Sequence, residues 1–144
     1  HWAEGAPMLA WWQRCAEFLS PATTPLDEAV LRFSAPPAQL KNLVGDVQAA
    51  VSAAEVGARL AAHAGNGVLF ARLQGEHLTA ALPALFADLA TRWQAITLLA
   101  APLDAKHRLD VWGPPPAGFP LMQRIKEQFD PQSTLNPGRF LGRL

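Results

Sequence analysis

Apolar residues follow two different spacings along the chain, and each spacing predicts a different kind of element. Residues 28–34 alternate between apolar and polar side chains, which predicts a strand with one buried face. Residues 40–51 place apolar side chains three and four positions apart, which is typical of a helix with one buried face. The apolar runs 57–64 and 68–73 flank a Gly-Asn-Gly corner at residues 65–67, so they predict a hairpin.

The second half of the chain continues with another helix and another strand. Apolar residues from Leu78 to Trp93 predict a second long helix, and Pro83 marks either its start or a kink. Residues 95–99 predict the last strand, and residues 100–118 are expected to form a loop. The order strand, helix, strand, strand, helix, strand predicts an α+β, ferredoxin-like split βαβ fold. We expect an antiparallel sheet with both long helices packed on one face.

Two further helices are predicted at the ends of the chain. Residues 7–19 form an apolar face that includes Trp11 and Trp12, which favours core or interdomain packing, with a flavin or substrate contact as the alternative. Residues 119–129 carry a second apolar stripe, and this helix ends at Asp130 because a proline follows. The predicted parts are an N-terminal helical segment and loop (1–27), a ferredoxin-like cap domain (28–118) and a terminal helix and tail (119–144).

The composition narrows the possible partners. Lys+Arg and Asp+Glu are equal at 12 each, which argues against nucleic acid or an anionic membrane surface as the main partner. The sequence contains no apolar run of about 18 residues, so no membrane-spanning segment is expected. Cys15 is the only cysteine, which excludes an internal disulfide or a CxxC pair, and we expect a buried structural thiol.

The tail carries the most specific motif of the chain. Residues 125–139 read IKEQFDPQSTLNPGR, in which an Asn-Pro-Gly turn precedes an always-charged arginine. This segment resembles the C-terminal signature of FAD-linked oxidases of the vanillyl-alcohol oxidase and p-cresol methylhydroxylase superfamily. In that superfamily an FAD-binding domain lies N-terminal to the cap domain. A chain of 144 residues holds one core but not two, and it starts without methionine, so the resemblance implies a C-terminal piece of the parent protein.

The resemblance also implies a cofactor role for the tail. Asn136, Gly138 and Arg139 are the predicted FAD contacts, and no residue of this chain is predicted to be catalytic. FAD is expected in the full-length parent and is not expected to be retained by this piece alone. The alternative for Arg139 is an ion pair with an acidic side chain of its own domain.

The sequence of the hairpin distinguishes two branches of the superfamily. In many of its hydroxy-acid dehydrogenases the hairpin reads G-H-x-G-D-G-N-x-H, and the two histidines hold a divalent metal that engages the substrate. Here His63 and both glycines of the corner match, but Phe70 replaces the second histidine. Residues 100–108 also lack the glutamate-histidine pair of the family's H-E-H-G segment. We therefore expect no metal site, with His63 as a partly buried hairpin residue and His107 as a solvated loop residue.

This pattern of lost ligands resembles the FAD-binding subunits of bacterial glycolate oxidases, as do segments 110–114 and 136–140. The resemblance implies oxidation of a 2-hydroxy acid, glycolate, to the 2-oxo acid glyoxylate. The implied partners are the upstream FAD-binding domain of the same protein, a catalytic flavin subunit and an iron-sulfur subunit. The implied location is the cytoplasm, with association to the inner membrane through partners left open. Two alternatives remain, a catalytic 2-hydroxy-acid dehydrogenase subunit and a stand-alone ferredoxin-like binding module without enzymatic activity.

The tryptophans exceed what one small core needs. Trp2, Trp11, Trp12 and Trp112 are expected to form an exposed apolar patch when the rest of the parent is absent. The expected consequence is self-association of the piece.

Overall fold

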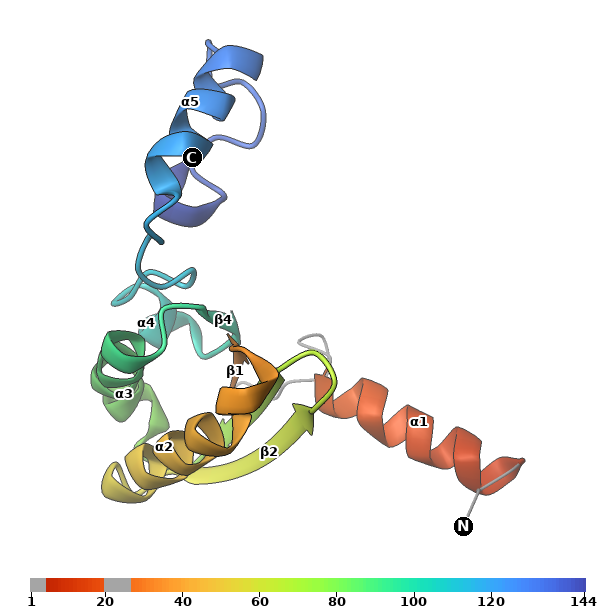
Figure 1. Ribbon diagram of the computed structural model, residues 1–144. Helices are drawn as coiled ribbons and strands as arrows, with labels where there is room; N and C mark the ends of the chain where they lie inside the picture. Colours follow the sequence, from red (N-terminus) through yellow and green to blue (C-terminus); the bar gives the residue numbers. More distant parts are fainter. Residues whose placement is uncertain (1–4, 20–26) are drawn as a thin grey trace.

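The computed structural model describes residues 5–19 and 27–144 (Figure 1). Trp2 and most of the predicted loop before residue 27 lie outside the described residues. The elements are α1 (Ala6–Leu19), β1 (Glu28–Ser34), the 3₁₀ turn η2 (Pro37–Gln39), α2 (Leu40–Ala53), β2 (Gly57–His63), β3 (Val68–Gln74), α3 (Leu78–Arg92), β4 (Ile96–Ala100), α4 (Leu103–Lys106), α5 (Phe119–Phe129) and the 3₁₀ turn η3 (Leu141–Arg143).

The four strands form one antiparallel sheet in the order β2-β3-β1-β4. The central strand β1 therefore lies between β3 and β4, and the hairpin strand β2 lies at the edge. This order is the one expected when two βαβ units are interleaved, because each crossover helix skips the strand between its own two strands. The predicted α+β class and antiparallel sheet are confirmed.

The core lies between one face of the sheet and the helices α2 and α3. Alternate residues of each strand point to opposite faces, and one set of them packs with the buried faces of the two helices. From the two central strands this set comprises Ala29, Leu31, Phe33, Leu69, Ala71 and Leu73, and from the helices it includes Leu43, Val47, Leu82 and Leu89. The other face of the sheet carries no long helix (Figure 1).

One predicted element is wrong, and one of two alternatives for another is excluded. The segment predicted as loop contains the short helix α4, which forms because Ala105 is fully buried in the core and holds that turn against α3. Of the two alternatives for Pro83, a helix start is excluded, since α3 begins at Leu78 and continues through the proline. Leu78 and Leu82 are both buried there, so tertiary packing holds the turn that Pro83 would otherwise disfavour.

The corner of the hairpin makes a close approach that only glycine allows. Gly67 has φ +69°, and a Cβ built there would lie 1.8 Å from the carbonyl oxygen of Ala35. Gly65, at the other side of the same corner, has no such neighbour within 4 Å. We expect Gly67→Ala to lower the free energy of unfolding by about 1–3 kcal/mol, because an L side chain is strained at this φ and clashes with backbone.

The matched control is Gly65→Ala, which should change the free energy of unfolding by less than about 0.5 kcal/mol. Urea denaturation followed by circular dichroism measures both variants. Equal effects of the two substitutions would show that the close approach to Ala35 does not restrict this corner.

The two end helices project away from the sheet and its helices (Figure 1). On α1 the exposed apolar residues are Met8, Leu9, Trp11 and Trp12, and on α5 they are Leu121, Met122, Ile125 and Phe129. Phe129 is 79% exposed, although the stripe to which it belongs has the spacing of a buried helix face. Of the predicted exposed patch, Trp11 and Trp12 are exposed on α1, and α5 carries an apolar surface that was not predicted.

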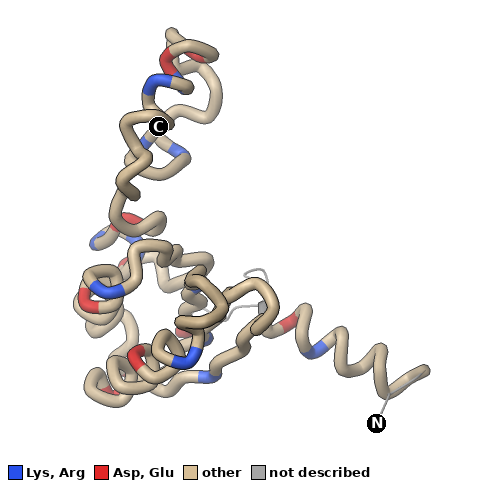
Figure 2. Tube along the Cα trace, in the orientation of Figure 1, with Lys and Arg blue, Asp and Glu red and all other residues tan. Residues whose placement is uncertain are grey.

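Three burial predictions are corrected by this arrangement. Cys15 is only half-buried, because α1 lies apart from the core. His63 is exposed rather than partly buried, since it ends the edge strand β2 on the face without long helices. Trp112 is half-buried rather than exposed, because its ring packs on Phe140. Acidic and basic positions are interspersed along the described chain (Figure 2).

Candidate functional site

The tail folds back on α5 through one carboxylate. Asp130 is 6% exposed, and its side chain accepts hydrogen bonds from the backbone N–H of Thr134 at 2.9 Å and of Leu135 at 2.9 Å. It also accepts one from the Thr134 hydroxyl at 3.0 Å and forms an ion pair with Lys126. The Lys126 ammonium further donates to the Leu135 carbonyl at 2.7 Å. These contacts, here called the Asp130 turn, reverse the chain direction directly after α5.

The Asp130 turn lowers the pKa of its carboxyl group well below the ordinary value of 3.8. The main cause is the hydrogen bond from Lys126, followed by the backbone N–H of Leu135, while burial acts in the opposite direction. Thr134 adds two weaker contributions of the same sign as Lys126. The charged form of Asp130 is therefore the form that holds the turn.

The rest of the tail returns along α5. A Cβ on Gly142 would lie 2.2 Å from the ring of Phe119, so the end of the tail contacts the first residue of the helix. A small cavity of about 190 Å³ lies between the tail and the helix, with Gln123 and Glu127 on one side and Pro137 on the other. The tail and α5 thus form one hairpin-like unit.

The three predicted cofactor contacts lie together in a turn of this returning segment. The N–H of Arg139 donates to the carbonyl of Asn136 at 3.2 Å, and Asn136 and Gly138 have φ values of +48° and +71°. No heavy atom lies within 4 Å of the Cβ position of Gly138, so backbone there is open to approach. Arg139 is exposed, and its guanidinium has no hydrogen bond or ion pair within the described ranges 5–19 and 27–144.

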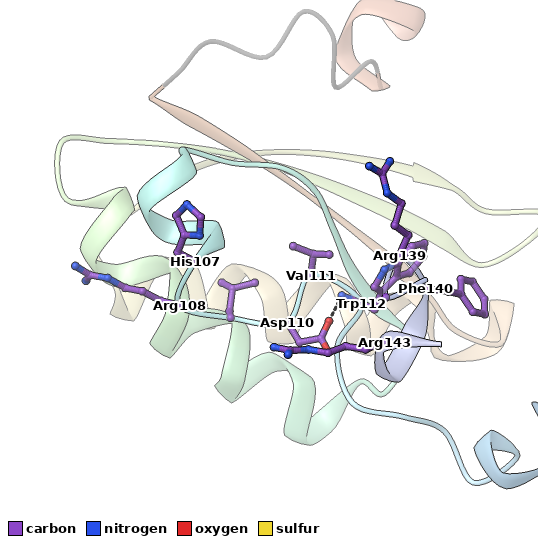
Figure 3. Close-up of a pocket in the computed structure, with 10 residues that line it drawn as sticks. His107, Arg108, Asp110, Val111, Trp112, Arg139, Phe140 and Arg143 are labelled. Atoms are coloured by element: carbon purple, nitrogen blue, oxygen red, sulfur yellow. Dashed lines mark hydrogen bonds between the residues drawn. The ribbon is translucent and has the colours of Figure 1, made fainter. Parts of the chain in front are cut away.

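The turn borders an open cavity of about 740 Å³ between the tail and the segment that follows α4 (Figure 3). Segment 107–112 forms one wall, and Gly138, Arg139, Phe140 and Arg143 form the other. The two walls meet where the rings of Trp112 and Phe140 pack edge to face, with centroids 5.2 Å apart. The first wall is itself fixed to the sheet, because the N–H of Leu98 in β4 donates to the Val111 carbonyl at 2.7 Å.

The cavity lining has more cations than anions. Arg108, Arg139 and Arg143 line it together with His107, whereas Asp110 is its one lining carboxylate among the residues described. Asp110 is in turn engaged by the N–H of Trp112 at 3.0 Å. In Figure 3 the guanidinium groups of Arg108 and Arg139 point in different directions, so the cavity is basic without focusing its charge on one point.

Sequence reasoning named Arg139 as a cofactor contact, which stays a prediction, and did not name the other residues that line this cavity. Arg108 and Arg143 were not predicted as site residues, and Trp112 was assigned to an exposed patch. The contact between Trp112 and Phe140 joins positions 28 residues apart, so no local spacing reveals it. His107 is exposed, and it lines the cavity.

The hairpin holds the remaining candidate chemistry. His63 and Phe70 lie on the sheet face without long helices, where His63 pairs with Val68 and Phe70 with Ala61. Within the described part of the chain, no group of three or more His, Cys, Asp or Glu residues lies together as metal ligands would. The prediction that the hairpin binds no metal awaits measurement.

The comparison with known families concerns the tail. Residues 114–140 match the family model of FAD linked oxidases, C-terminal domain. The matched stretch contains both the Asp130 turn and the turn from Asn136 to Arg139. It supports the predicted resemblance to an FAD-linked oxidase C-terminal domain, and with it FAD as the cofactor of the parent protein.

No curated protein and no solved structure matches the chain. None of the helices among residues 5–19 and 27–144 combines the length and the apolar character needed to cross a bilayer.

Proposed function

We propose that the chain is the C-terminal part of the FAD-binding subunit of a glycolate oxidase-type flavoprotein, which oxidises a 2-hydroxy acid to a 2-oxo acid. The observation that carries this proposal is the family match over residues 114–140, which falls on the part of the chain that exposes Arg139 and the apolar face of α5. The proposed division is an N-terminal segment (1–27), a cap domain (28–118) and a tail (119–144).

The tail fits a role at the boundary with an FAD-binding domain. The apolar face of α5 is exposed and suits packing against that upstream domain of the parent. Asn136 and Gly138 offer an open backbone turn, and Arg139 offers a guanidinium without an acceptor in the described chain. These features fit an anionic group of FAD, whose phosphates pair well with arginine.

In the proposed reaction, FAD carries out the redox chemistry and the residues of this chain position the cofactor. When bound, FAD supplies the acceptor for the electrons of the substrate. The residues of this chain bind and orient: Arg139 holds a negative group of the cofactor, and the Asp130 turn holds Arg139 in place. No residue of the chain is assigned a catalytic role.

The assignment to the glycolate oxidase type rests on the hairpin. Phe70 stands where the hydroxy-acid dehydrogenases of the superfamily carry a second metal-binding histidine, and a phenyl ring cannot ligate a metal. This favours the FAD-binding subunit over the catalytic subunit. The proposed partners are the upstream FAD-binding domain, a catalytic flavin subunit and an iron-sulfur subunit, in a cytoplasmic complex.

The test is Arg139→Ala in the full-length parent, with FAD affinity and thermal stability measured separately. We expect FAD retention to weaken roughly tenfold to a hundredfold, because a charge-assisted hydrogen bond contributes about 1.5–3 kcal/mol. The control is Arg124→Ala, which removes an exposed arginine of α5 that lies outside the turn from Asn136 to Arg139, and it should leave FAD affinity unchanged. Unchanged FAD affinity with lowered stability in Arg139→Ala would make Arg139 a structural residue and end its cofactor role.

The same preparation tests the function as a whole. The wild-type parent should carry about one equivalent of flavin, and its complex with the catalytic flavin subunit and the iron-sulfur subunit should reduce an acceptor dye when glycolate is added. A parent without flavin would reject the proposal and favour the stand-alone binding module. The sheet, α2 and α3 share one hydrophobic core, which such a module requires.

A further inference from the structure

The sheet face opposite α2 and α3 has its own set of buried and charged residues. Val30, Val68 and Ala100 are buried, yet they lie outside the core that packs against those helices. Strand alternation places Arg32 and Arg72 on this same face, because their neighbours Leu31 and Leu73 belong to that core. The face is therefore partly covered, although it carries no long helix.

Around Arg72, the charged side chains of this face have partners. Arg72 is 6% exposed, pairs with the carboxylate of Glu28, and donates to the Glu17 carbonyl at 2.9 Å and the Phe18 carbonyl at 3.3 Å. Arg59 on the edge strand reaches the same carboxylate of Glu28 at 3.5 Å. Only the C-terminal end of α1 thus contacts this part of the face, while the rest of α1 projects away (Figure 1), and two arginines share one acid there.

Arg32 differs from these two arginines. It lies on the central strand β1, and its side chain is half-buried. Across the sheet it stands opposite Phe70 of β3 and Thr97 of β4. Within residues 5–19 and 27–144 its guanidinium has neither a hydrogen bond nor an ion pair.

A half-buried arginine packs its aliphatic stem on the sheet, and a guanidinium without an acceptor at its end is available to an anion. The planar fork of arginine matches a carboxylate with two parallel hydrogen bonds. One unmatched cation suits a monoanion. Residues directly opposite on neighbouring strands have Cβ atoms about 4.5–5.5 Å apart, so Phe70 and Thr97 are within reach of a ligand held by Arg32.

We propose that Arg32 binds the carboxylate of a small organic acid on the face of the sheet without long helices. Phe70 forms the apolar wall of this site, and the hydroxyl of Thr97 is the polar group beside the ligand. The inference rests on the proposed function only for the identity of the acid, which would then be the 2-hydroxy acid substrate. Arg32 serves to bind and orient this acid.

The test is a titration of the chain with sodium glycolate at constant ionic strength, with sodium chloride as the replaced salt, followed by nitrogen-proton NMR. We expect saturable shifts at the Arg32 side chain and at the amides of Phe70 and Thr97, with a Kd on the order of 10 mM. Arg32→Gln should weaken this binding roughly tenfold to a hundredfold. Arg59→Gln, which removes a cation from the same face, is the matched control and should bind glycolate as the wild type does.

Arg32→Lys is a second variant for the case that Arg32→Gln does not fold, because it keeps the positive charge and removes only the planar fork. It should bind glycolate more weakly than the wild type, and the binding should still saturate. Shifts that rise linearly in the wild type, saturable shifts centred on residues 107–112, or unchanged affinity in Arg32→Gln would each overturn the proposal. None of these readouts requires FAD. A parent protein without flavin would therefore reject the proposed function and leave the carboxylate site standing.

Discussion

Replacing Asp130 with alanine is expected to release the tail from α5 while the sheet remains folded. The substitution removes the acceptor of Lys126, Thr134 and Leu135 in a single step, and these contacts define the chain reversal. Hydrogen exchange measures the result directly: protection at the amides of Thr134 and Leu135 should be lost completely. Amides of β1 and β3 should exchange as in the wild type, because α5 projects away from the sheet (Figure 1).

The control for this experiment is Asp104→Ala on the short helix α4, where the carboxylate is exposed. It should leave the protection of Thr134 and Leu135 unchanged. Retained protection in Asp130→Ala would show that the tail is held by Phe119 and Phe140 instead of by the carboxylate.

Acid should reproduce the effect of Asp130→Ala. Because the folded pKa of Asp130 lies below its unfolded value of 3.8, the turn is stabilised fully above that value. This contribution decreases as the pH falls below 3.8 and disappears once the pH passes the lowered folded pKa. Amide protection at Leu135 should therefore be constant near neutral pH and decline in strong acid.

A second large effect is expected in the core. Leu31→Ala should lower the free energy of unfolding by about 2–5 kcal/mol, because the leucine is fully buried on the central strand and its removal leaves a cavity. Total stabilities of domains are about 5–15 kcal/mol, so this one change removes a large part of the total. Urea denaturation followed by far-ultraviolet circular dichroism gives the midpoint and slope for the variant.

The matched control uses the same substitution on α5. Leu121 is 57% exposed, so Leu121→Ala should alter the free energy of unfolding by less than about 0.5 kcal/mol in this chain. A loss comparable to that of Leu31→Ala would mean that the apolar face of α5 is already covered, for example by self-association. Sedimentation of the wild type at the same concentration distinguishes that case.

The sheet and its two helices were predictable because their signal is local. The alternation over residues 28–34 and the helical spacing over residues 40–51 each reflect one buried face. In the structure these two faces pack into the same core. The antiparallel order then followed from short connections and from the hairpin corner. The short helix α4 escaped prediction since four residues show no periodicity, and only the burial of Ala105 requires it.

The burial of the end helices could not be predicted in the same way. The stripe from Phe119 to Phe129 has the spacing of a buried face, but spacing does not say which surface covers it, and within this chain most of the stripe is exposed. The stop at Asp130 was predicted from the proline that follows. Its bonds to Thr134 and Leu135 were missed, because they depend on the path of the chain after the stop.

The contact between the rings of Trp112 and Phe140 closes a loop that contains α5 and its returning tail. These two segments are held mostly by contacts within the loop, so the loop forms a second cooperative unit of the chain. Residues 114–140, the stretch that the family model matches, fall within this loop almost from end to end. Such a unit opens with its own free energy, lower than that of the sheet. A single melting temperature would therefore describe the sheet alone, and the tail would melt first as a separate step.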